Sequence, residues 1–462
     1  MGPRTRALLR PLLLTAVAFT GGAFATNLAV ARTGADSPYD MLQQMSRVLV
    51  LIENDYVEPV DRRRLVEGAI KGMVAELDPH SDYMPPEDYK IFESDTEGHF
   101  GGIGVEVDFQ EDHVTVIAPI EGSPADHAGI KSGDRIVAID NQSVHGKSPD
   151  ELVRIMRGPP GTKVVVAVRR EGNDKLLYFT LTREIIHVSS VADKLLAGSI
   201  AYIRIKQFQE GTHDELLEAV TRLRNKAHGD LHGTLLDLRN NPGGLVNEAS
   251  AVANEFLTSG VIYTTRHRGK IVDEVRAADT GALRRGPLVV LVNEYSASAA
   301  ELVAGALQDR HRGTLVGART FGKGSVQTIL DLPGGAGLRL TTMRYYTPSG
   351  RSIQAQGVLP DVKVAAARPP DKTFGIVRES DLENHLPAQG PPGAGVSGDA
   401  GALVQASANQ DAGAKAEGDG GSSEDEQTHL GVAREIPDNP SGGADLALSI
   451  GYQILRGVLV KR

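Results

Sequence analysis

The strongest signal for chemistry is a pair of serines where an apolar segment meets a helix-like segment. An apolar run over residues 288–292 ends at Asn293. The sequence Glu-Tyr-Ser-Ala-Ser-Ala-Ala-Glu that follows places Ser296 and Ser298 at the start of a predicted helix. A hydroxyl there lies near unpaired backbone N–H groups and the positive end of the helix dipole, which together stabilise an oxyanion. Either serine is therefore a candidate nucleophile; the alternative is that one of them only caps the helix.

A second predicted strand, residues 233–238, also runs into a helix through a turn of sequence Arg-Asn-Asn-Pro-Gly-Gly. The paired glycines Gly243 and Gly244 allow the backbone to approach a substrate carbonyl and to point N–H groups at it. Taken alone, this segment is equally compatible with an ordinary strand-to-helix turn. Two such turns in one sheet, one with serine and one with Gly-Gly, favour an acyl-transfer site.

A serine nucleophile needs a base, and the chain has neither a G-x-S-x-G elbow nor an H-E-x-x-H metal motif. The remaining candidate is Lys323, in the segment Gly-Lys-Gly-Ser-Val-Gln. A lysine is a base only when neutral, and lowering its pKa from about 10.4 to about 7.5 costs roughly 4 kcal/mol. Gln327 could orient the amine if residues 323–327 form a helical or tight turn, since residues four apart on a strand are separated by about 13 Å.

The same segment must be compared with a phosphate-binding loop. Residues 317–323 match G-x-x-x-x-G-K, but Gly324 stands where such a loop needs serine or threonine to hold magnesium. The match fails at its metal ligand, so we do not expect a nucleotide site.

A glycine-rich segment lies upstream in a region of short strands. Residues 100–105 read Phe-Gly-Gly-Ile-Gly-Val and offer successive backbone N–H groups beside a strand edge. Such a nest can bind the terminal carboxylate of a peptide that adds as a further strand between this edge and the predicted helix at 150–157. The downstream run from Gly122 to Asp134, Gly-Ser-Pro-Ala-Asp-His-Ala-Gly-Ile-Lys-Ser-Gly-Asp, makes this signal much stronger.

The elements that must position these residues follow from periodicity. Apolar residues at three- and four-residue steps predict two amphipathic helices over 39–77, a structural cap or dimer element. Short alternating runs over 98–183 predict a small β-rich domain with one helix. From 184 to about 365 strands alternate with helices, which predicts a largely parallel sheet with ligands at the carboxyl ends of its strands. We therefore expect a multi-domain α/β protein.

Composition narrows the class and the compartment. The chain has 462 residues, 59 acidic and 49 basic residues, a net charge of −10 and no cysteine. Disulfides and thiol catalysis are thus excluded, and without a dense basic stripe we expect no nucleic-acid partner. Three arginines and an apolar run within residues 1–31 predict an export signal, cleaved after Ala31 or kept as a membrane anchor. Residues 366–440 predict a flexible low-complexity tail and residues 441–462 a C-terminal helix that docks back.

From Tyr39 to Val364 the sequence resembles the carboxyl-terminal processing proteases, tail-specific serine peptidases of bacteria and chloroplasts. The resemblance rests on six landmarks in order: Leu-Asp-Pro-His-Ser at 77–81, the two glycine-containing segments of the β-rich domain, Leu-Arg-Asn-Asn-Pro-Gly-Gly at 238–244, Ser-Ala-Ser-Ala-Ala-Glu at 296–301, Gly-Lys-Gly-Ser-Val-Gln at 322–327, and Tyr-Thr-Pro-Ser-Gly-Arg at 346–351. It implies a helical N-terminal region over 36–97, a PDZ domain over 98–183 and a crotonase-like serine protease core over 184–365.

The resemblance also implies residue roles. Ser298 is then the nucleophile and Ser296 local structure, with Lys323 the general base and Gln327 its orienting partner. The oxyanion donors are backbone N–H groups, and the PDZ loop binds the substrate C-terminus. The oxyanion donors are Ala299 and either Gly243 or Gly244, and the loop that binds the C-terminus is Gly102, Ile103, Gly104 and Val105. Arg157 either reports PDZ occupancy to the active site or is a solvated arginine.

The function so predicted is a serine endopeptidase that cleaves exported proteins near their C-termini through an acyl-enzyme, with no metal or organic cofactor. Its partners would be proteins with apolar C-termini, an envelope adaptor and further copies of itself, in the bacterial periplasm or cell envelope. The rival function is a non-catalytic peptide-binding scaffold in which only the PDZ domain acts.

Overall fold

A computed structural model describes residues 38–109, 114–173, 175–364, 377–389, 436–443 and 445–460. The chain divides into two compact units, residues 1–73 and residues 74–462. The predicted export segment lies outside the described residues, and so does most of the predicted tail. Among helices in the described ranges, none combines the length and apolar character needed to cross a membrane.

The first unit contains two helices, α2 (Pro38–Asp55) and the greater part of α3 (Arg62–Ala75), as the periodicity predicts. In α2 large apolar side chains stay exposed, among them Met41, Leu42 and Val48 at 62%, 56% and 54%. A helix that leaves such a surface uncovered typically contacts another partner.

The core of the second unit is a six-stranded sheet in the order β10-β11-β12-β15-β16-β19. Its strands are β10 (Val191–Leu196), β11 (Ile200–Ile205), β12 (Gly233–Asp237), β15 (Leu288–Val292), β16 (Thr314–Gly317) and β19 (Val362–Lys363). Only β10 is antiparallel to its neighbour; the other pairs are parallel. Every residue of β12 and β15 is buried, which explains their continuous apolar runs.

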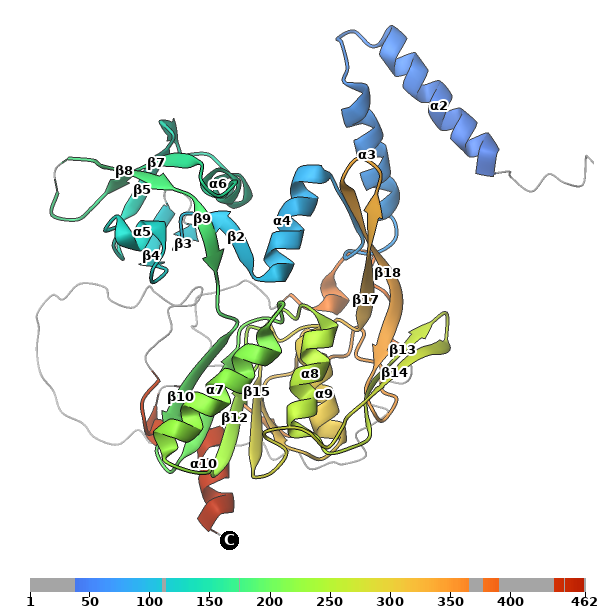
Figure 1. The fold of residues 1–462 in the computed structure, drawn as a ribbon. Coiled ribbons are helices and arrows are strands. Elements are labelled where there is room, and N and C mark those ends of the chain that lie inside the picture. Colours follow the sequence, from blue (N-terminus) through green and yellow to red (C-terminus); the bar gives the residue numbers. More distant parts are fainter. Residues whose placement is uncertain are drawn as a thin grey trace, which may run out of the picture. The chain divides into compact units, whose positions relative to one another are not determined.

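Helices cover both faces of this sheet (Figure 1). On one face, α7 (Thr212–Ala227), α8 (Val246–Phe256) and α9 (Ala299–Asp309) share a core with β11, β12 and β15. On the other, α10 (Leu446–Val460) packs Leu448, Tyr452 and Leu455 against the same strands. The docked C-terminal helix agrees with the prediction.

A second, antiparallel sheet was not predicted. It contains β1 (Asp82–Met84), β13 (Val261–His267), β14 (Lys270–Arg276), β17 (Ser325–Leu332) and β18 (Ala336–Tyr346). Its two hairpins, β13–β14 and β17–β18, carry many half-exposed polar residues. Between β1 and the β-rich domain in sequence lies α4 (Pro86–Glu97), which ends at Gly98 in the left-handed conformation.

The β-rich domain consists of short strands, as predicted, but contains two helices where the sequence predicted one. The strands are β3 (Val105–Phe109), β4 (Val114–Pro119), β5 (Arg135–Ile139), β6 (Gln142–Ser143), β7 (Lys163–Arg169) and β8 (Leu177–Thr182) in one sheet, with α5 (Pro124–His127) and α6 (Pro149–Met156). A separate pair, β2 (His99–Gly102) and β9 (Glu184–His187), connects it to the core. Buried side chains of both helices and the strands form one apolar cluster.

Residues 377–389 differ from the predicted flexible tail. They form a short 3₁₀ turn, η1 (Glu379–Asp381), and pack on the segment that precedes β17. The Arg378 guanidinium donates to the carbonyls of Arg319 and Thr320 at 3.0 and 2.8 Å, and the Glu379 N–H donates to the Phe321 carbonyl at 3.3 Å. These contacts hold residues 377–389 against the part of the core that carries Lys323.

Candidate active site

Ser298 lies where the sequence predicts, at the N-terminus of α9 and just beyond the carboxyl end of β15. It is 9% exposed and has φ 52° and ψ −115°, a positive-φ conformation that is uncommon for serine and is typical of functional turns. Ser296 has a structural role: its hydroxyl donates to the Leu238 carbonyl at 2.8 Å and accepts from the Asn293 N–H at 3.0 Å. The Ser296 hydroxyl therefore joins the two strand-to-helix turns.

The Gly-Gly turn after β12 lies directly against Ser298. Gly243 and Gly244 have φ values of 105° and 126°, which favour glycine. A β-carbon on Gly243 would be 2.8 Å from Ser298 Cβ, and one on Gly244 would be 2.0 Å from the Phe208 carbonyl oxygen. Glycine is thus required at position 243 for the turn to approach Ser298, and at position 244 for it to pack against the Phe208 backbone.

The backbone N–H groups around Ser298 differ in their availability. The Gly243 N–H donates to the Asn241 side chain at 2.8 Å, so in this structure it is already used. The N–H groups of Gly244 and Ala299 have no hydrogen-bond partner in the described part of the chain. Of the three predicted oxyanion donors, Gly244 and Ala299 are therefore the two with a free N–H.

A buried carboxylate that the sequence analysis assigned no role connects the serine to the lysine. Glu301 is fully buried, and its Oε2 accepts from the N–H of Ser298 at 2.9 Å and from the N–H of Lys323 at 2.8 Å. Its Oε1 accepts from the Gly322 N–H at 2.8 Å and from the Thr320 hydroxyl. The backbones of Ser298 and Lys323 thus lie within two hydrogen-bond lengths of each other.

The geometry of Glu301 follows from a sequence signal that was available. A serine at the N-cap followed three residues later by glutamate is a capping box, in which the glutamate receives the N-cap N–H. Burial raises the pKa of Glu301 to about 7, although its four hydrogen bonds act in the opposite direction.

The side chain of Lys323 lies in a largely buried, charged environment. The pKa of Lys323 is lowered to about 8: burial is the main cause, the positive charge of Arg339 adds to it, and the carboxylates of Glu379, Asp78 and Glu301 act in the opposite direction. At pH 8 about half of a group with this pKa is neutral. A lysine with this pKa can accept a proton near neutral pH, as a general base must.

Residues 323–327 do not form the helical or tight turn on which the predicted role of Gln327 depended. Lys323 precedes strand β17 and Gln327 lies within that strand. The Gln327 side-chain amide donates to the hydroxyls of Ser325 at 3.0 Å and Thr341 at 3.2 Å. Because both hydrogen bonds go to hydroxyls of the β17–β18 hairpin, the structure shows no direct contact through which Gln327 orients the lysine.

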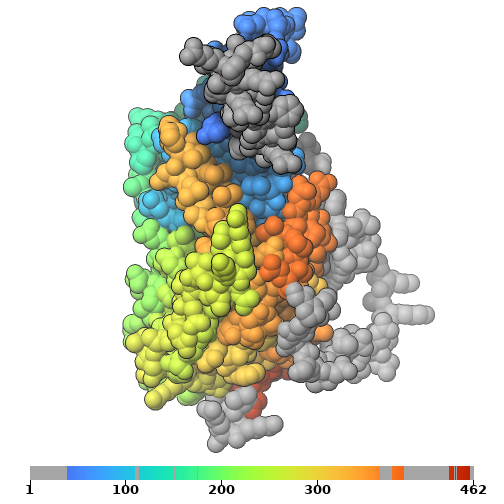
Figure 2. Space-filling model, turned by 90° about the vertical axis from the view of Figure 1, so that its right-hand side faces the viewer, coloured from blue at the N-terminus to red at the C-terminus, as the bar shows by residue number. Residues whose placement is uncertain are grey.

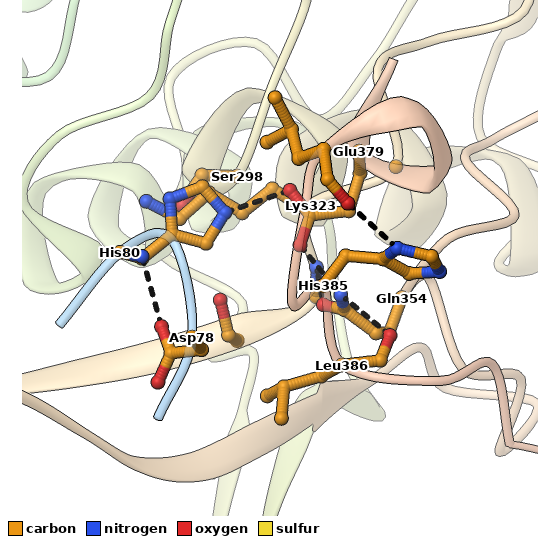
Figure 3. A network of polar contacts seen from close by, with 12 residues as sticks. Asp78, His80, Ser298, Lys323, Gln354, Glu379, His385 and Leu386 are labelled. Carbon is orange, nitrogen blue, oxygen red and sulfur yellow. Dashed lines mark hydrogen bonds and ion pairs between the residues drawn. The ribbon is translucent and has the colours of Figure 1, made fainter. Parts of the chain in front are cut away.

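A polar network surrounds Lys323 on the side of residues 77–81 and 377–389 (Figure 3). His80 Nε2 lies 2.7 Å from Glu379 Oε2, and the Gln354 side-chain amide donates to Glu379 Oε1 at 2.6 Å. Gln354 Oε1 in turn accepts from the Gly324 N–H at 3.0 Å, next to Lys323. Glu379 is fully buried; hydrogen bonds from His80 and Gln354 outweigh burial and hold its pKa below the usual value.

Asp78 anchors the other end of this network. It accepts from the N–H groups of His80 and Ser81, both at 2.9 Å, from the Ser81 hydroxyl at 2.7 Å and from the Thr341 hydroxyl at 3.1 Å. Burial opposes ionisation of Asp78, but these hydrogen bonds outweigh it and hold the pKa below its usual value. The sequence of residues 77–81 does not reveal this role, because Thr341 and Lys323, which place Asp78 at the site, are distant in sequence.

The predicted carboxylate loop of the PDZ domain runs from the end of β2 into β3. The Ile103 carbonyl accepts from the Ala125 N–H at 2.9 Å, and the Gly104 carbonyl accepts from the Ser123 hydroxyl at 2.9 Å. The N–H groups of Ile103 and Gly104 donate to no other residue in the described ranges. The loop is therefore fixed by its carbonyls, with these two N–H groups unpaired.

Arg157, predicted either as a sensor or as a solvated arginine, follows α6 and has defined contacts. Its guanidinium lies 2.6 Å from the Asp95 carboxylate on α4 and 4.2 Å from the centre of the Phe100 ring. With 21% of its side chain exposed, Arg157 is mostly packed and joins the PDZ domain to α4.

These observations define the class: a PDZ-containing serine peptidase of mixed α/β fold. Residues 199–364 match the model of Peptidase family S41, residues 115–170 that of the PDZ domain, and residues 24–88 that of the activating protease CtpB N-terminal domain.

The chain is 42% identical over 366 residues to a carboxy-terminal-processing protease of Bartonella bacilliformis, covering 78% of this chain and 83% of the relative. It is 38% identical over 347 residues to a probable CtpA-like serine protease of Staphylococcus aureus, covering 72% and 68%. The solved structure of a photosystem II D1 C-terminal processing protease is 30% identical, with coverage of 76% and 92% and a TM-score of 0.45. The chain belongs to the carboxy-terminal-processing proteases of peptidase family S41.

Proposed function

We propose that the protein is an endopeptidase that cleaves exported proteins near their C-termini through a Ser298–Lys323 pair. Neutral Lys323 accepts the proton of the Ser298 hydroxyl as its oxygen attacks a substrate carbonyl. The N–H groups of Gly244 and Ala299 receive the developing oxyanion. The protonated lysine then gives its proton to the leaving amine, and water, deprotonated by the same lysine, hydrolyses the acyl-enzyme.

The observation that carries this proposal is the shared Glu301 carboxylate. It binds the N–H groups of Ser298 and Lys323 with one oxygen atom, so the two residues are placed by a single buried group. The lowered pKa of Lys323 supports its role as base. Gln327 retains an indirect role: its hydrogen bonds to Ser325 and Thr341 hold the β17–β18 hairpin beside the lysine.

Digestion of an unstructured protein with an apolar C-terminus tests the peptidase assignment. The wild type should degrade it, and Ser298→Ala should lose activity by at least a thousandfold. Lys323→Arg should be equally inactive because arginine stays protonated. Ser259→Ala and Lys363→Arg, exposed positions elsewhere in the core, are the matched controls. Equal digestion by the wild type and Ser298→Ala would refute the proposal, and would leave the non-catalytic scaffold.

The PDZ loop supports recognition of the substrate C-terminus. The unpaired N–H groups of Ile103 and Gly104, between Gly102 and Val105, are successive backbone donors of the kind that bind a terminal carboxylate. A peptide with a free C-terminus should bind Ser298→Ala at least tenfold more tightly than its amidated form. Equal affinities would remove this role. Through its contacts with Asp95 and Phe100, Arg157 would transmit occupancy of this loop to α4.

Location and assembly complete the proposal. The basic and apolar character of residues 1–31 supports export to the periplasm or cell envelope, with the segment cleaved or kept as an anchor. The exposed apolar side chains of α2 support self-association or an envelope adaptor as partner. Fractionation of cells that express the chain, and the mass of the purified protein in solution, test the two points separately.

A further inference from the structure

A cavity of about 390 Å³ next to the catalytic residues is lined by three arginines. Arg266 and Arg268 come from the β13–β14 hairpin and Arg344 from β18, and Leu386 and Gln389 also line the cavity. In Figure 2 the yellow-green hairpin and the orange-red segment that contains residues 377–389 lie on the face toward the viewer. Three positive charges thus gather around one hollow.

The cavity adjoins the catalytic groups through Thr341, which also lines it. The Thr341 hydroxyl accepts from the Gln327 amide at 3.2 Å and donates to Asp78 at 3.1 Å. Asp78 also faces the cavity and lies within electrostatic reach of Lys323. The cavity thus shares Asp78 and Thr341 with the polar surroundings of Lys323.

The arginines lack the acidic partners that such a cluster normally has. Arg266 and Arg344 are directly opposite each other on β13 and β18, a like-charge pair that destabilises an antiparallel sheet. Within the described ranges none of the three arginines forms an ion pair, and the buried Nε of Arg266 has no hydrogen-bond partner. Asp78 is acidic and lines the cavity too, but its carboxylate already accepts hydrogen bonds from Ser81, His80 and Thr341.

The arrangement of the cluster suits a carboxylate. The Arg266 guanidinium lies 4.0 Å from the centre of the Tyr346 ring, which fixes its plane, and the Arg344 guanidinium donates to the Pro387 carbonyl at 3.1 Å. Planar guanidinium groups held in this way bind carboxylates through two parallel hydrogen bonds. A bound anion would also relieve the repulsion between Arg266 and Arg344.

We propose that this arginine cavity is a substrate subsite that binds an acidic side chain of the peptide close to the bond that is cleaved. The inference rests on the proposed peptidase function and adds a specificity to it: the enzyme prefers substrates with aspartate or glutamate at one position near the scissile bond. The terminal carboxylate is bound elsewhere, at the PDZ loop.

The test uses C-terminally amidated fluorogenic peptides, in which glutamate or glutamine occupies each position around the scissile bond in turn. For the wild type, kcat/KM should be about tenfold higher with glutamate at one position, because one charge-assisted pair is worth about this factor. The ratio should fall to near one in Arg266→Met and in Arg344→Met, and stay near ten in Arg285→Met, an exposed arginine of the same core. A wild-type ratio near one at every position would overturn the inference.

Binding to Ser298→Ala separates this inference from the peptidase proposal. The preferred glutamate peptide should bind this variant more tightly than the matching glutamine peptide does, whether or not the wild type cleaves it. If Arg266→Met or Arg344→Met fails to fold, Arg268→Gln, on the turn of the β13–β14 hairpin, replaces it. Equal affinities would overturn the subsite.

The same carboxylate chemistry is present in this chain at Glu424, Asp425 and Glu426. If those residues occupied the cavity, they would compete with the glutamate peptide. Replacing them by the corresponding amides in Ser298→Ala would then tighten binding of that peptide, and this result would overturn the assignment of the cavity to substrate. Unchanged affinity is the expected result.

Discussion

The pH dependence of kcat/KM should report the ionisation of Lys323. With a pKa of about 8, the neutral amine amounts to about a tenth of the enzyme at pH 7, half at pH 8 and nine tenths at pH 9. The rate constant should therefore rise about fivefold from pH 7 to pH 8 and less than twofold from pH 8 to pH 9, because only the neutral amine accepts the serine proton.

The charges around Lys323 allow this inflection to be moved in both directions. Arg339 lowers the pKa of Lys323, whereas Glu379, Asp78 and Glu301 raise it. Glu379→Gln removes a negative charge and should move the inflection to lower pH. Arg339→Met removes a positive charge and should move it to higher pH. A nearby charge shifts the pKa of a partly buried group by about one pH unit, so the inflections of the two variants should lie about two pH units apart.

The assay is hydrolysis of a fluorogenic peptide at concentrations well below KM, from pH 5.5 to pH 10 at constant ionic strength. Glu383→Gln is the matched control, since Glu383 is an exposed acid in the segment that carries Glu379. Its inflection should equal that of the wild type. The reasoning is refuted if both charge variants keep the wild-type inflection or shift it in the same direction, since Lys323 would then not be the group that titrates.

Three further variants test the site. Lys323→Met should raise the free energy of unfolding at pH 7, measured by urea titration, by at most about 3 kcal/mol, because the folded protein destabilises the charged amine. This gain should disappear as the pH rises from about 8 to above 10.5, where the amine is neutral in both states. No gain at pH 7 would contradict the conclusion that burial lowers the pKa of Lys323. Glu301→Gln should lower kcat at least tenfold and destabilise the fold by about 2–4 kcal/mol, because an amide nitrogen would then face backbone N–H groups. An unchanged kcat and an unchanged melting temperature would rule out the positioning role of Glu301. Gly243→Ala should lower kcat more than a hundredfold while peptide binding by the PDZ domain is retained, because the new methyl group would meet Ser298; near-normal kcat would show that the turn can move away.

The sequence predicted the central sheet well because its elements are strongly periodic. Strands β12 and β15 and the helices α8 and α9 that follow them lie at the predicted places. Buried parallel strands are continuous apolar runs, so their type and position can be read locally. The position of Ser298 after β15 followed from that reading.

The antiparallel sheet and the network around Lys323 could not be predicted in the same way. The β17–β18 hairpin is half-exposed and rich in polar residues, so its alternation is weak. The predicted role of Gln327 depended on a turn over residues 323–327, where the structure has the start of β17 instead. Glu379 resembles any acidic residue of a polar tail, and its partners His80 and Gln354 are distant in sequence. Only tertiary packing brings these groups together. By contrast, the role of Glu301 could have been read from its capping-box spacing with Ser298.

Covalent labelling of the nucleophile tests the central claim most directly. A fluorophosphonate should form one adduct on Ser298, located by peptide mass spectrometry, at a rate that rises through pH 8 in the wild type and falls at least a hundredfold in Lys323→Met. An adduct on another serine, or labelling of Ser298 at the wild-type rate without the lysine, would contradict the claim that Lys323 activates Ser298.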